Sequence, residues 1–471
     1  MINHQDILQV ENNADLLSVR EPATGVPIWM LIRNQYFREV LSDMVFEKSI
    51  RKASSKKLRI KDLINISFRT FHSNLKLRRK RKYQNCVISS GSGVIKGENN
   101  AYDRIGGYFA DSHEDNCLYI NELKNFKFPE KLVHKNIYFN FVSYRFLLLK
   151  KNLSSYKKAK RLASYVLRKA VKASYELINW VPGDKRFQIL QNSLTKSIQR
   201  APYLVSHYEE LVKSFGIKLL LVEGGMYSSY IPVIVGAKNA GAITAEYQHG
   251  SVFPGHDAYN FADKILESET CRKVFPDYFL SYGEWWHDQF NAPIQKVAIG
   301  NPHLTEFLNT NLKTQQIEKN EILILSDGIN TEKYIKLAKD IKSSLNNPSL
   351  VVKLRLHPME IRFKSSIDKS IAFDKEANFY KSASHSKLVI GEVSTGLFEA
   401  LKFADHVFIW SSKRSRFGFP TFPLPSFEKV SEVIHFLNLS KSSTDDYPNL
   451  NMLWKENWKE MYQNFLNSVI I

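Results

Sequence analysis

Cysteine is scarce in this sequence of 471 residues. The three cysteines, Cys86, Cys117 and Cys271, form no CxxC pair and match no spacing of metal ligands. Neither a disulfide framework nor a cysteine-based zinc site can therefore organise the fold. So few unpaired thiols are typical of a reducing compartment.

Long apolar runs are also missing. No stretch approaches the roughly 20 apolar residues that a membrane-spanning helix needs. The opening residues, MINHQDILQVENNADLL, lack the basic and apolar regions of a signal peptide. We therefore expect a soluble cytoplasmic chain that touches the inner face of the cytoplasmic membrane only peripherally.

Acidic residues are outnumbered, with 47 Asp and Glu against 66 Lys and Arg, which gives a formal net charge of +19. Such an excess bears on partners rather than on fold, and it favours phosphate-bearing ones: nucleic acid, an anionic membrane surface or a phosphorylated small molecule. No recognition helix, zinc finger or RNP motif is present, so we expect no specific nucleic-acid partner.

Much of the positive charge falls in two segments, Lys48–Lys82 and Lys150–Lys172. The first also carries apolar residues, namely Leu63, Ile64, Ile66, Phe68 and Phe71. It is either a solvated surface segment or a patch held against anionic lipid, where each Lys or Arg contributes about 1 kcal/mol near the surface. Before it, Gly25–Phe46 has apolar residues at helical spacing, which predicts an amphipathic helix packed on the first domain.

Hydrophobic residues make up 44% of the sequence, enough for two or three domains with their own cores. Buried-strand patterns alternate with helical ones in two blocks, which predicts an α/β fold. We expect four parts: an N-terminal helical and basic segment (1–84), a Rossmann-like domain (85–308), a second Rossmann-like domain (309–445) and a C-terminal helix packing back across both (446–471). The segment NCVISSGSG, at Asn85–Gly93, reads as a strand and a Gly/Ser loop but lacks a complete dinucleotide fingerprint.

In the first block, two neighbouring strands end in polar residues. Ile217–Val222 leads into Glu223 and two glycines, and Ala242–Tyr247 leads into Gln248–His249–Gly250. Ligands of open α/β sheets bind beyond the carboxyl ends of strands, so Glu223 and His249 should face a ligand. His256 and Tyr259 follow in a loop that we expect to contact the substrate, and we add them as candidate substrate-binding residues.

The second block repeats this arrangement. Glu321–Leu325 precedes Ser326–Asp327–Gly328, and Val351–Leu356 contains Arg355 and precedes His357–Pro358. A cation and an imidazole at a strand end suit an anionic ligand.

A third strand of this block, Lys387–Ile390, precedes Ser394, Thr395 and Gly396 at the start of a helix. Backbone N–H groups and small hydroxyl side chains there form either a phosphate cradle or an ordinary N-cap.

The order of these motifs resembles a known group of enzymes. Glu223–Gly224, His357–Pro358 and Ser394–Thr395 resemble the acidic–Gly, HP and Ser-Ser/Thr motifs of bacterial sialyltransferases, polysialyltransferases and capsule Kdo transferases, which have the GT-B fold. EYQHGSVFPGHDAY also resembles a signature of bacterial surface-polysaccharide transferases. The resemblance covers roughly 85–412.

The resemblance implies roles for individual residues. Glu223 would be the general base, and His357, Ser394 and Thr395 would bind the nucleotide phosphate. These families usually carry two acidic residues before the glycine, often with the first as the base. Val222 stands at that position here, so Asp327 is a rival base. Glu399, in STGLFEAL, corresponds to the residue that holds the nucleotide ribose in many GT-B enzymes.

The expected protein is thus a GT-B glycosyltransferase with two Rossmann-like domains facing a central cleft. It needs no cofactor, and because the sequence has no evident DxD triad we expect metal-independent transfer with inversion. The best guess for the donor is a CMP-activated nonulosonic acid or Kdo, transferred to a hydroxyl of a capsule or lipopolysaccharide glycan. A UDP-hexose or CDP-polyol donor is the first alternative, and a sugar-nucleotide epimerase of related architecture is another. A non-catalytic nucleic-acid or membrane-binding protein is the alternative from a different class.

Overall fold

A computed structural model describes residues 2–46, 60–78, 82–91, 93–96, 100–123, 132–140, 153–311, 318–357, 360, 371–438 and 447–470. Pro358 of the predicted donor site lies outside these ranges, as do the basic residues between 48 and 59.

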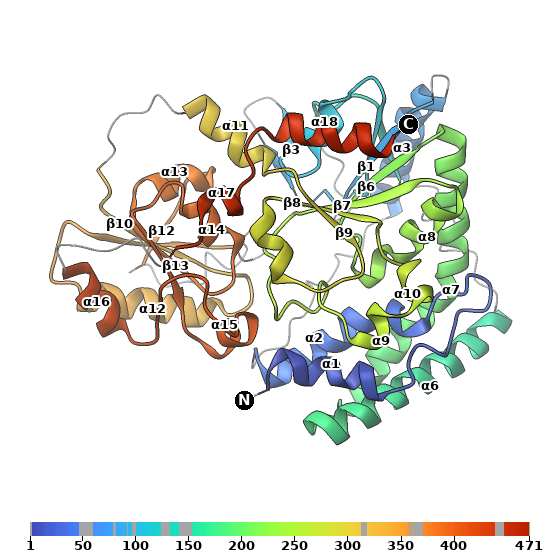
Figure 1. The fold of residues 1–471 in the computed structure, drawn as a ribbon, viewed down its shortest axis with the longest axis horizontal. Coiled ribbons are helices and arrows are strands. Elements are labelled where there is room, and N and C mark those ends of the chain that lie inside the picture. Colours follow the sequence, from blue (N-terminus) through green and yellow to red (C-terminus); the bar gives the residue numbers. More distant parts are fainter. Residues whose placement is uncertain are drawn as a thin grey trace.

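A seven-stranded parallel sheet forms the core of the N-terminal half (Figure 1). Its strand order is β5-β4-β1-β6-β7-β8-β9. The strands are β1 (Asn85–Ser89), β4 (Cys117–Asn121), β5 (Ile137–Phe139), β6 (Leu219–Glu223), β7 (Ile243–Tyr247), β8 (Tyr278–Ser281) and β9 (Gln295–Ala298). A small antiparallel pair, β2 (Val94–Lys96) and β3 (Ala101–Asp103), lies beside it.

The C-terminal half contains a second parallel sheet of six strands, in the order β12-β11-β10-β13-β14-β15. These are β10 (Glu321–Leu325), β11 (Val351–Arg355), β12 (Ala372–Phe373), β13 (Ser386–Gly391), β14 (His406–Trp410) and β15 (Ser426–Phe427). The predicted fold class, α/β with two Rossmann-like domains, is therefore confirmed. The domain boundaries drawn from the sequence stay a prediction.

Successive side chains of a strand point to opposite faces of the sheet, and in both sheets the apolar side chains of each face are covered by helices. In β1, Cys86 and Ile88 pack against α7 (Asp184–Phe215) and α8 (Ile231–Asn239), the latter preceded by η3 (Ser228–Tyr230). Val87 faces the other way, toward α4 (Gly107–Asp111) and α18 (Trp458–Val469).

The second sheet is covered in the same way. One face packs on α12 (Thr331–Ser344) and α16 (Val430–Asn438). The other packs on α13 (Phe379–Ser384) and α14 (Thr395–Ala400). The remaining elements of this half are α15 (Lys413–Gly418) and α17 (Leu450–Leu453).

The N-terminal segment is helical and is part of the first domain's core. It contains α1 (His4–Asn13), η1 (Ile28–Leu31) and α2 (Arg33–Met44), which pack beside α6 (Leu153–Ile178) and α7. The expected helix within 25–46 is thus present, shortened by the 3-10 turn before it. The other connecting helices are α3 (Ile60–Arg78), α9 (Asp263–Leu266), α10 (Glu269–Arg272), η4 (Glu284–Gln289) and α11 (Pro302–Asn311).

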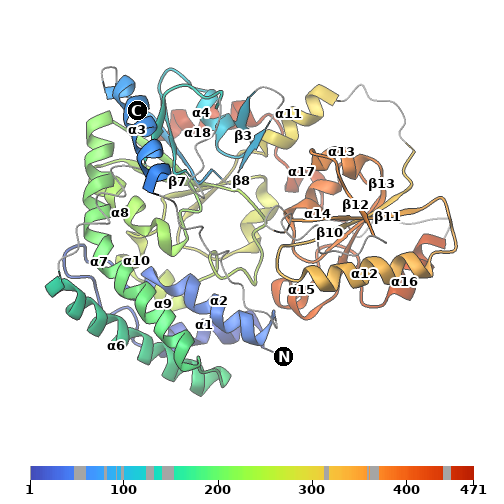
Figure 2. The ribbon, with the colours of Figure 1, turned by 180° about the vertical axis from the view of Figure 1, so that it is seen from behind.

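The chain returns from the second domain to the first near its end, and Figure 2 shows α18 lying against the first domain. The sequence predicted one helix over about 452–469, whereas the structure has two, α17 and α18. The break falls where Lys455 N donates to Tyr282 O (2.7 Å) and Asn457 adopts a left-handed conformation (φ 56°). No helix among the described residues combines the length and the apolar character needed to cross a membrane.

Candidate functional site

Glu223 is the last residue of β6, and the left-handed Gly224 (φ 77°) turns the chain immediately after it. Its side chain is buried, and one carboxylate oxygen accepts a hydrogen bond from Ser90 N in the Gly/Ser loop after β1 (3.1 Å). β1 and β6 are neighbouring parallel strands, so both loops leave the same edge of the sheet. The structure therefore places Glu223 at the carboxyl-end edge, as its position in the sequence indicates.

A second carboxyl group, Glu246, lies beside it on β7. It is fully buried and accepts hydrogen bonds from Tyr259 OH (2.6 Å) and Met226 N (2.8 Å). Burial raises the pKa of Glu246 to about 8, against the opposing effect of those two hydrogen bonds. His249 Nδ1 lies 3.8 Å from Glu246 Oε1, so the predicted His249 and Tyr259 both adjoin this group.

His256 is enclosed by aromatic rings within the first domain. The rings of Tyr227, Phe253 and Tyr259 surround it, and its Nδ1 accepts from Ala258 N (3.2 Å). Burial lowers the pKa of His256 to about 4, so the imidazole is neutral at neutral pH. The substrate contact predicted for His256 stays a prediction.

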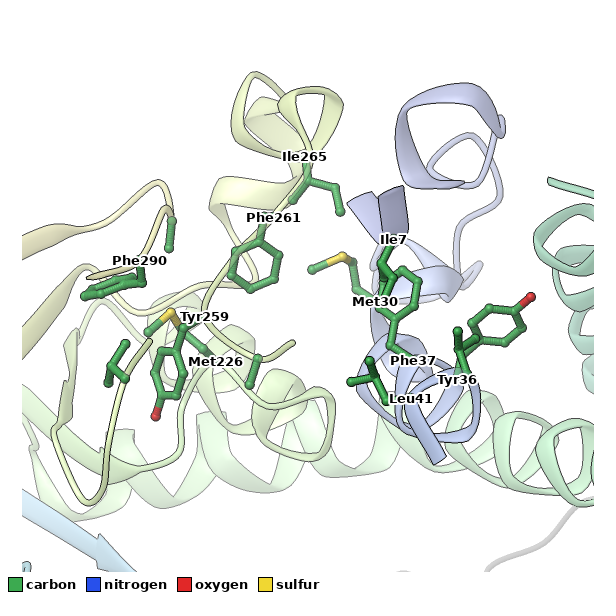
Figure 3. Packing of buried hydrophobic residues seen from close by; sticks show 14 of the residues in the cluster. Ile7, Met30, Tyr36, Phe37, Leu41, Met226, Tyr259, Phe261, Ile265 and Phe290 are labelled. Carbon is green, nitrogen blue, oxygen red and sulfur yellow. The ribbon is translucent and has the colours of Figure 1, made fainter. Parts of the chain in front are cut away.

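The loop that carries His256 and Tyr259 is held by the N-terminal helices (Figure 3). Arg33 of α2 is buried, pairs with Glu11 and donates to the carbonyls of Asp257 and Asn260. Its guanidinium also lies over the ring of Phe261 (4.3 Å). A buried cation needs such partners, so the N-terminal segment fixes the shape of this loop.

In the second domain, the two acids that follow β10 and β13 share their partners. Tyr334 OH lies within hydrogen-bond distance of both Asp327 (3.0 Å) and Glu392 (2.9 Å), and Arg414 of α15 forms ion pairs with both. Asp327, the predicted rival base, is thus already engaged by a guanidinium. A carboxylate held in that way is a weak proton acceptor.

His357 follows β11 and faces the turn after β10. A Cβ added at Gly328 (φ 84°) would stand 3.0 Å from His357 Nδ1, so the glycine makes room for the ring. The backbone N of His357 donates to Glu360 (2.9 Å), and Ser326 Oγ donates to the same carboxylate (2.8 Å). His357 is therefore tied through Glu360 to the end of β10.

Arg355, at the end of β11, has its partners within the second domain. Its guanidinium pairs with Asp374 and donates to Glu376 O (3.0 Å) and Ser382 Oγ (3.2 Å). These partners commit it to the segment between β12 and α13. A donor contact by Arg355 stays a prediction.

Ser394 and Thr395 begin α14, where the backbone N of Gly396 donates to Ser394 Oγ (3.2 Å). This is the N-cap alternative that the sequence left open, and a phosphate role is a proposal beside it.

The two domains meet at this corner. Ser251 Oγ donates to Val393 O (2.9 Å), and a Cβ at Gly250 would stand 3.8 Å from Thr395 Oγ1. The loop after β7 therefore touches the loop after β13. The carboxyl-end edges of the two sheets come together at that contact.

Glu399 lies on the buried side of the same helix and reaches the first domain. It accepts from Asn301 Nδ2 (3.2 Å), and burial raises its pKa to about 7 while Arg104 opposes the rise. In this structure the predicted ribose ligand is thus a contact between the domains, and a ribose role stays a prediction.

Three residues that adjoin the candidate site escaped the sequence analysis: Glu246, Arg104 and Arg414. Glu246 gave one usable signal, because it is a carboxylate within a strand, ITAEY, whose pattern predicts burial. Arg104 and Arg414 gave no such signal, because their local sequence is that of ordinary surface arginines. Only the tertiary structure brings them to the interface between the two domains.

Among the described residues, no group of three or more His, Cys, Asp or Glu side chains lies close enough together to hold a metal ion. The three cysteines are buried and unpaired.

Comparisons with known proteins add little. No family model matches the chain, and no curated protein matches it. Similar solved structures include the UDP-GlcNAc 2-epimerase of Methanocaldococcus jannaschii in complex with UDP-GlcNAc and UDP, at 11% identity over 82% of this chain and 99% of that one, with a TM-score of 0.41.

Two further solved structures are similar at the same level. A putative UDP-N-acetylglucosamine 2-epimerase from Listeria monocytogenes has 10% identity over 81% of this chain and 91% of that one, with a TM-score of 0.40. The pneumococcal O-GlcNAc transferase GtfA in complex with UDP and GlcNAc has 14% identity over 56% of this chain and 59% of that one, with a TM-score of 0.35. Similarities this low assign neither a family nor an activity to the chain.

Proposed function

We propose that the protein is a glycosyltransferase that moves a sugar from a sugar nucleotide to an acceptor hydroxyl, with inversion and without a metal. The main support is the contact between the two parallel sheets at their carboxyl-end edges, where Gly250–Ser251 meets Val393–Thr395. Ligands of such sheets bind beyond those edges. Two reactants can therefore approach each other from separate domains.

The donor side is the second domain. His357 and the backbone at the start of α14 would neutralise the phosphate that leaves as the glycosidic bond breaks. Positive charge develops at the anomeric carbon while negative charge moves onto that phosphate, so fixed donors there stabilise the transition state. Ser394 and Thr395 would supply hydroxyl groups beside those backbone N–H groups.

The acceptor side is the first domain, with Glu223 as the general base. Removal of the acceptor proton by a positioned carboxylate contributes about 10²–10⁴-fold to the rate. Attack from the face opposite the leaving phosphate inverts the anomeric carbon. We assign Asp327 a different role, to hold Arg414 and Tyr334 in place, because it is already paired with both.

The motif resemblance suggests a CMP-activated nonulosonic acid or Kdo as the donor, and a UDP-hexose or CDP-polyol is the alternative. The acceptor would be a hydroxyl of a bacterial surface glycan or its lipid-linked precursor.

The test combines nucleotide binding with turnover. Thermal stabilisation by CMP, CDP and UDP identifies the nucleotide, and the matching sugar nucleotide is then supplied with and without acceptor glycans. Acceptor-dependent release of nucleotide that persists in chelator is expected. Conversion of the sugar nucleotide in the absence of any acceptor, or no stabilisation by any nucleotide, would overturn the proposal.

Variants then assign the roles. Glu223→Gln should keep nucleotide stabilisation and lose about 10²–10⁴-fold in turnover. Asp327→Asn, the matched change in the second domain, should lower thermal stability but keep most of the turnover. His357→Ala should lose nucleotide stabilisation. A reversal of the first two results would make Asp327 the base.

A further inference from the structure

The inner face of α3 fixes this helix on the first domain. Ile66 packs with Leu123 and Phe139 in a small core of its own. The side-chain amide of Asn74 donates to Phe139 O and accepts from Phe139 N, both at 2.9 Å. Because β5 is the edge strand of the sheet, α3 covers that edge and cannot rotate freely about its axis.

The outer face of α3 carries large apolar side chains. Ile64, Phe68, Phe71 and Leu75 are 64%, 71%, 54% and 41% exposed. Their spacing of four, three and four residues aligns them in one stripe along the helix. Leu63, Ile64, Phe68 and Phe71 also line a shallow open hollow. A contiguous exposed stripe of this kind marks an interaction surface.

Positive charge surrounds the stripe in the sequence. Between Lys48 and Lys82 there are fourteen Lys and Arg residues, while Asp62 is the only acidic residue. This segment therefore carries a large part of the net charge of +19. An occupant of the stripe must be apolar at its centre and anionic around it.

We propose that α3 is an interfacial helix that docks the protein on an anionic phospholipid bilayer. The stripe Ile64–Leu75 enters the boundary between headgroups and acyl chains, and the exposed Lys61 and Arg69 of the same helix contact lipid phosphates. Phe68 and Phe71 can stack on bases, but the aliphatic Ile64 and Leu75 at the two ends of the stripe cannot, so nucleic acid fits less well than a bilayer. The inference goes beyond the proposed transferase and does not depend on it.

The experiment is co-sedimentation of the full chain with vesicles of phosphatidylcholine alone or mixed with phosphatidylglycerol, without any nucleotide. We expect binding to the anionic vesicles that weakens as salt is raised. Phe68→Ser/Phe71→Ser should reduce the binding constant about tenfold or more, since two inserted aromatic side chains are lost.

Tyr156→Ser/Tyr175→Ser on α6 is the matched control. These tyrosines are 40% and 59% exposed on a helix that is also basic, and both views show α6 and α3 at opposite ends of the first domain (Figures 1 and 2). The control should bind vesicles like the wild type, and both double variants should melt like the wild type.

Three results would overturn the proposal. The wild type could fail to bind anionic vesicles, or both double variants could lose binding equally. Alternatively, the wild type could be a dimer without lipid that Phe68→Ser/Phe71→Ser converts to monomers, which would make the stripe a contact between copies. Transferase activity on a soluble acceptor is measured separately, so each of these results leaves the proposed function standing.

Discussion

At the scale of single residues, Glu246 illustrates how position changes chemistry. The same carboxyl group on the surface would be an unremarkable anion, but in β7 it is fully buried between Tyr259, Met226 and His249. Desolvation disfavours its charged form and raises its pKa to about 8. Glu223, one strand away, accepts a backbone hydrogen bond at the mouth of the Gly/Ser loop instead.

The raised pKa of Glu246 makes stability depend on pH. The folded protein holds this proton more tightly than the unfolded chain, whose Glu titrates near 4.5. Stability from this group is therefore complete below about pH 4.5 and is lost as pH rises through about 8. Glu246→Gln cannot ionise, so its free energy of unfolding relative to the wild type should increase by ~4 kcal/mol at most between pH 5 and 9.

Urea unfolding at a series of pH values measures this difference. If the free energies of unfolding of the wild type and Glu246→Gln changed with pH in parallel across this range, Glu246 would have an ordinary pKa in the folded protein.

At the scale of elements, the loop after β7 is held from three sides. Arg33 of α2 binds its carbonyls at Asp257 and Asn260, and Ser251 bonds to the loop after β13. Gly255 N donates to Gly418 O in α15 (2.9 Å). The loop therefore belongs to both domains, and its shape depends on how closely they approach.

A substitution at Gly255 tests how closely the two domains approach each other at this loop. A Cβ there would stand 2.4 Å from Phe417 O and 2.7 Å from Gly418 Cα, both backbone atoms that cannot swing aside. Gly255→Ala should destabilise the protein by about 1–3 kcal/mol, as overpacking does, and should weaken nucleotide stabilisation.

Gly183→Ala is the matched control, because nothing lies within 4 Å of a Cβ at that N-cap position. Its effect should stay below about 1 kcal/mol in urea titrations, because the only expected cost is that of alanine at an N-cap, and nucleotide stabilisation should be unchanged. Equal effects of the two variants would show that the contact between Gly255 and α15 carries no constraint.

At the scale of the whole molecule, a single core crosses from one domain to the other. It joins the N-terminal helices and the loop region before β9 to one face of the second sheet. Trp286 lies at the junction: its ring meets Phe398 of α14 (5.0 Å) and its Nε1 donates to Leu453 O (2.9 Å). We therefore expect the two domains to unfold together.

Calorimetry should show one transition for the wild type. Trp286→Ala should lower stability by about 3–5 kcal/mol, the usual cost of truncating a buried aromatic residue, and should separate the two domains into distinct transitions. Tyr203→Ala, at a partly exposed position on α7, is the control. Two well-separated transitions in the wild type would contradict this interpretation.

Much of the architecture could be predicted from the sequence. Glu321–Leu325 was placed without error, and Ala242–Tyr247 differs from β7 by one residue, because β-branched runs that end in glycine or polar turns are an unambiguous local signal. The C-terminal helix was predicted as continuous, since the pattern does not reveal that Lys455 bonds to Tyr282 or that Asn457 turns left-handed. Of the candidate site, the strand-end positions of Glu223, His249 and His357 were predictable for the same local reason. The pairings of Arg355 with Asp374, and of Asp327 with Arg414, were not.

The sequence by itself determined where each strand ends and which side chain follows it, because hydrophobic periodicity and turn residues act over a few neighbours. Only the tertiary structure decided which of those side chains is buried, paired or turned toward the other domain. The physical reason is that burial and ion pairing depend on residues that are distant in sequence, so two carboxylates with similar local patterns, Glu223 and Asp327, acquire different partners.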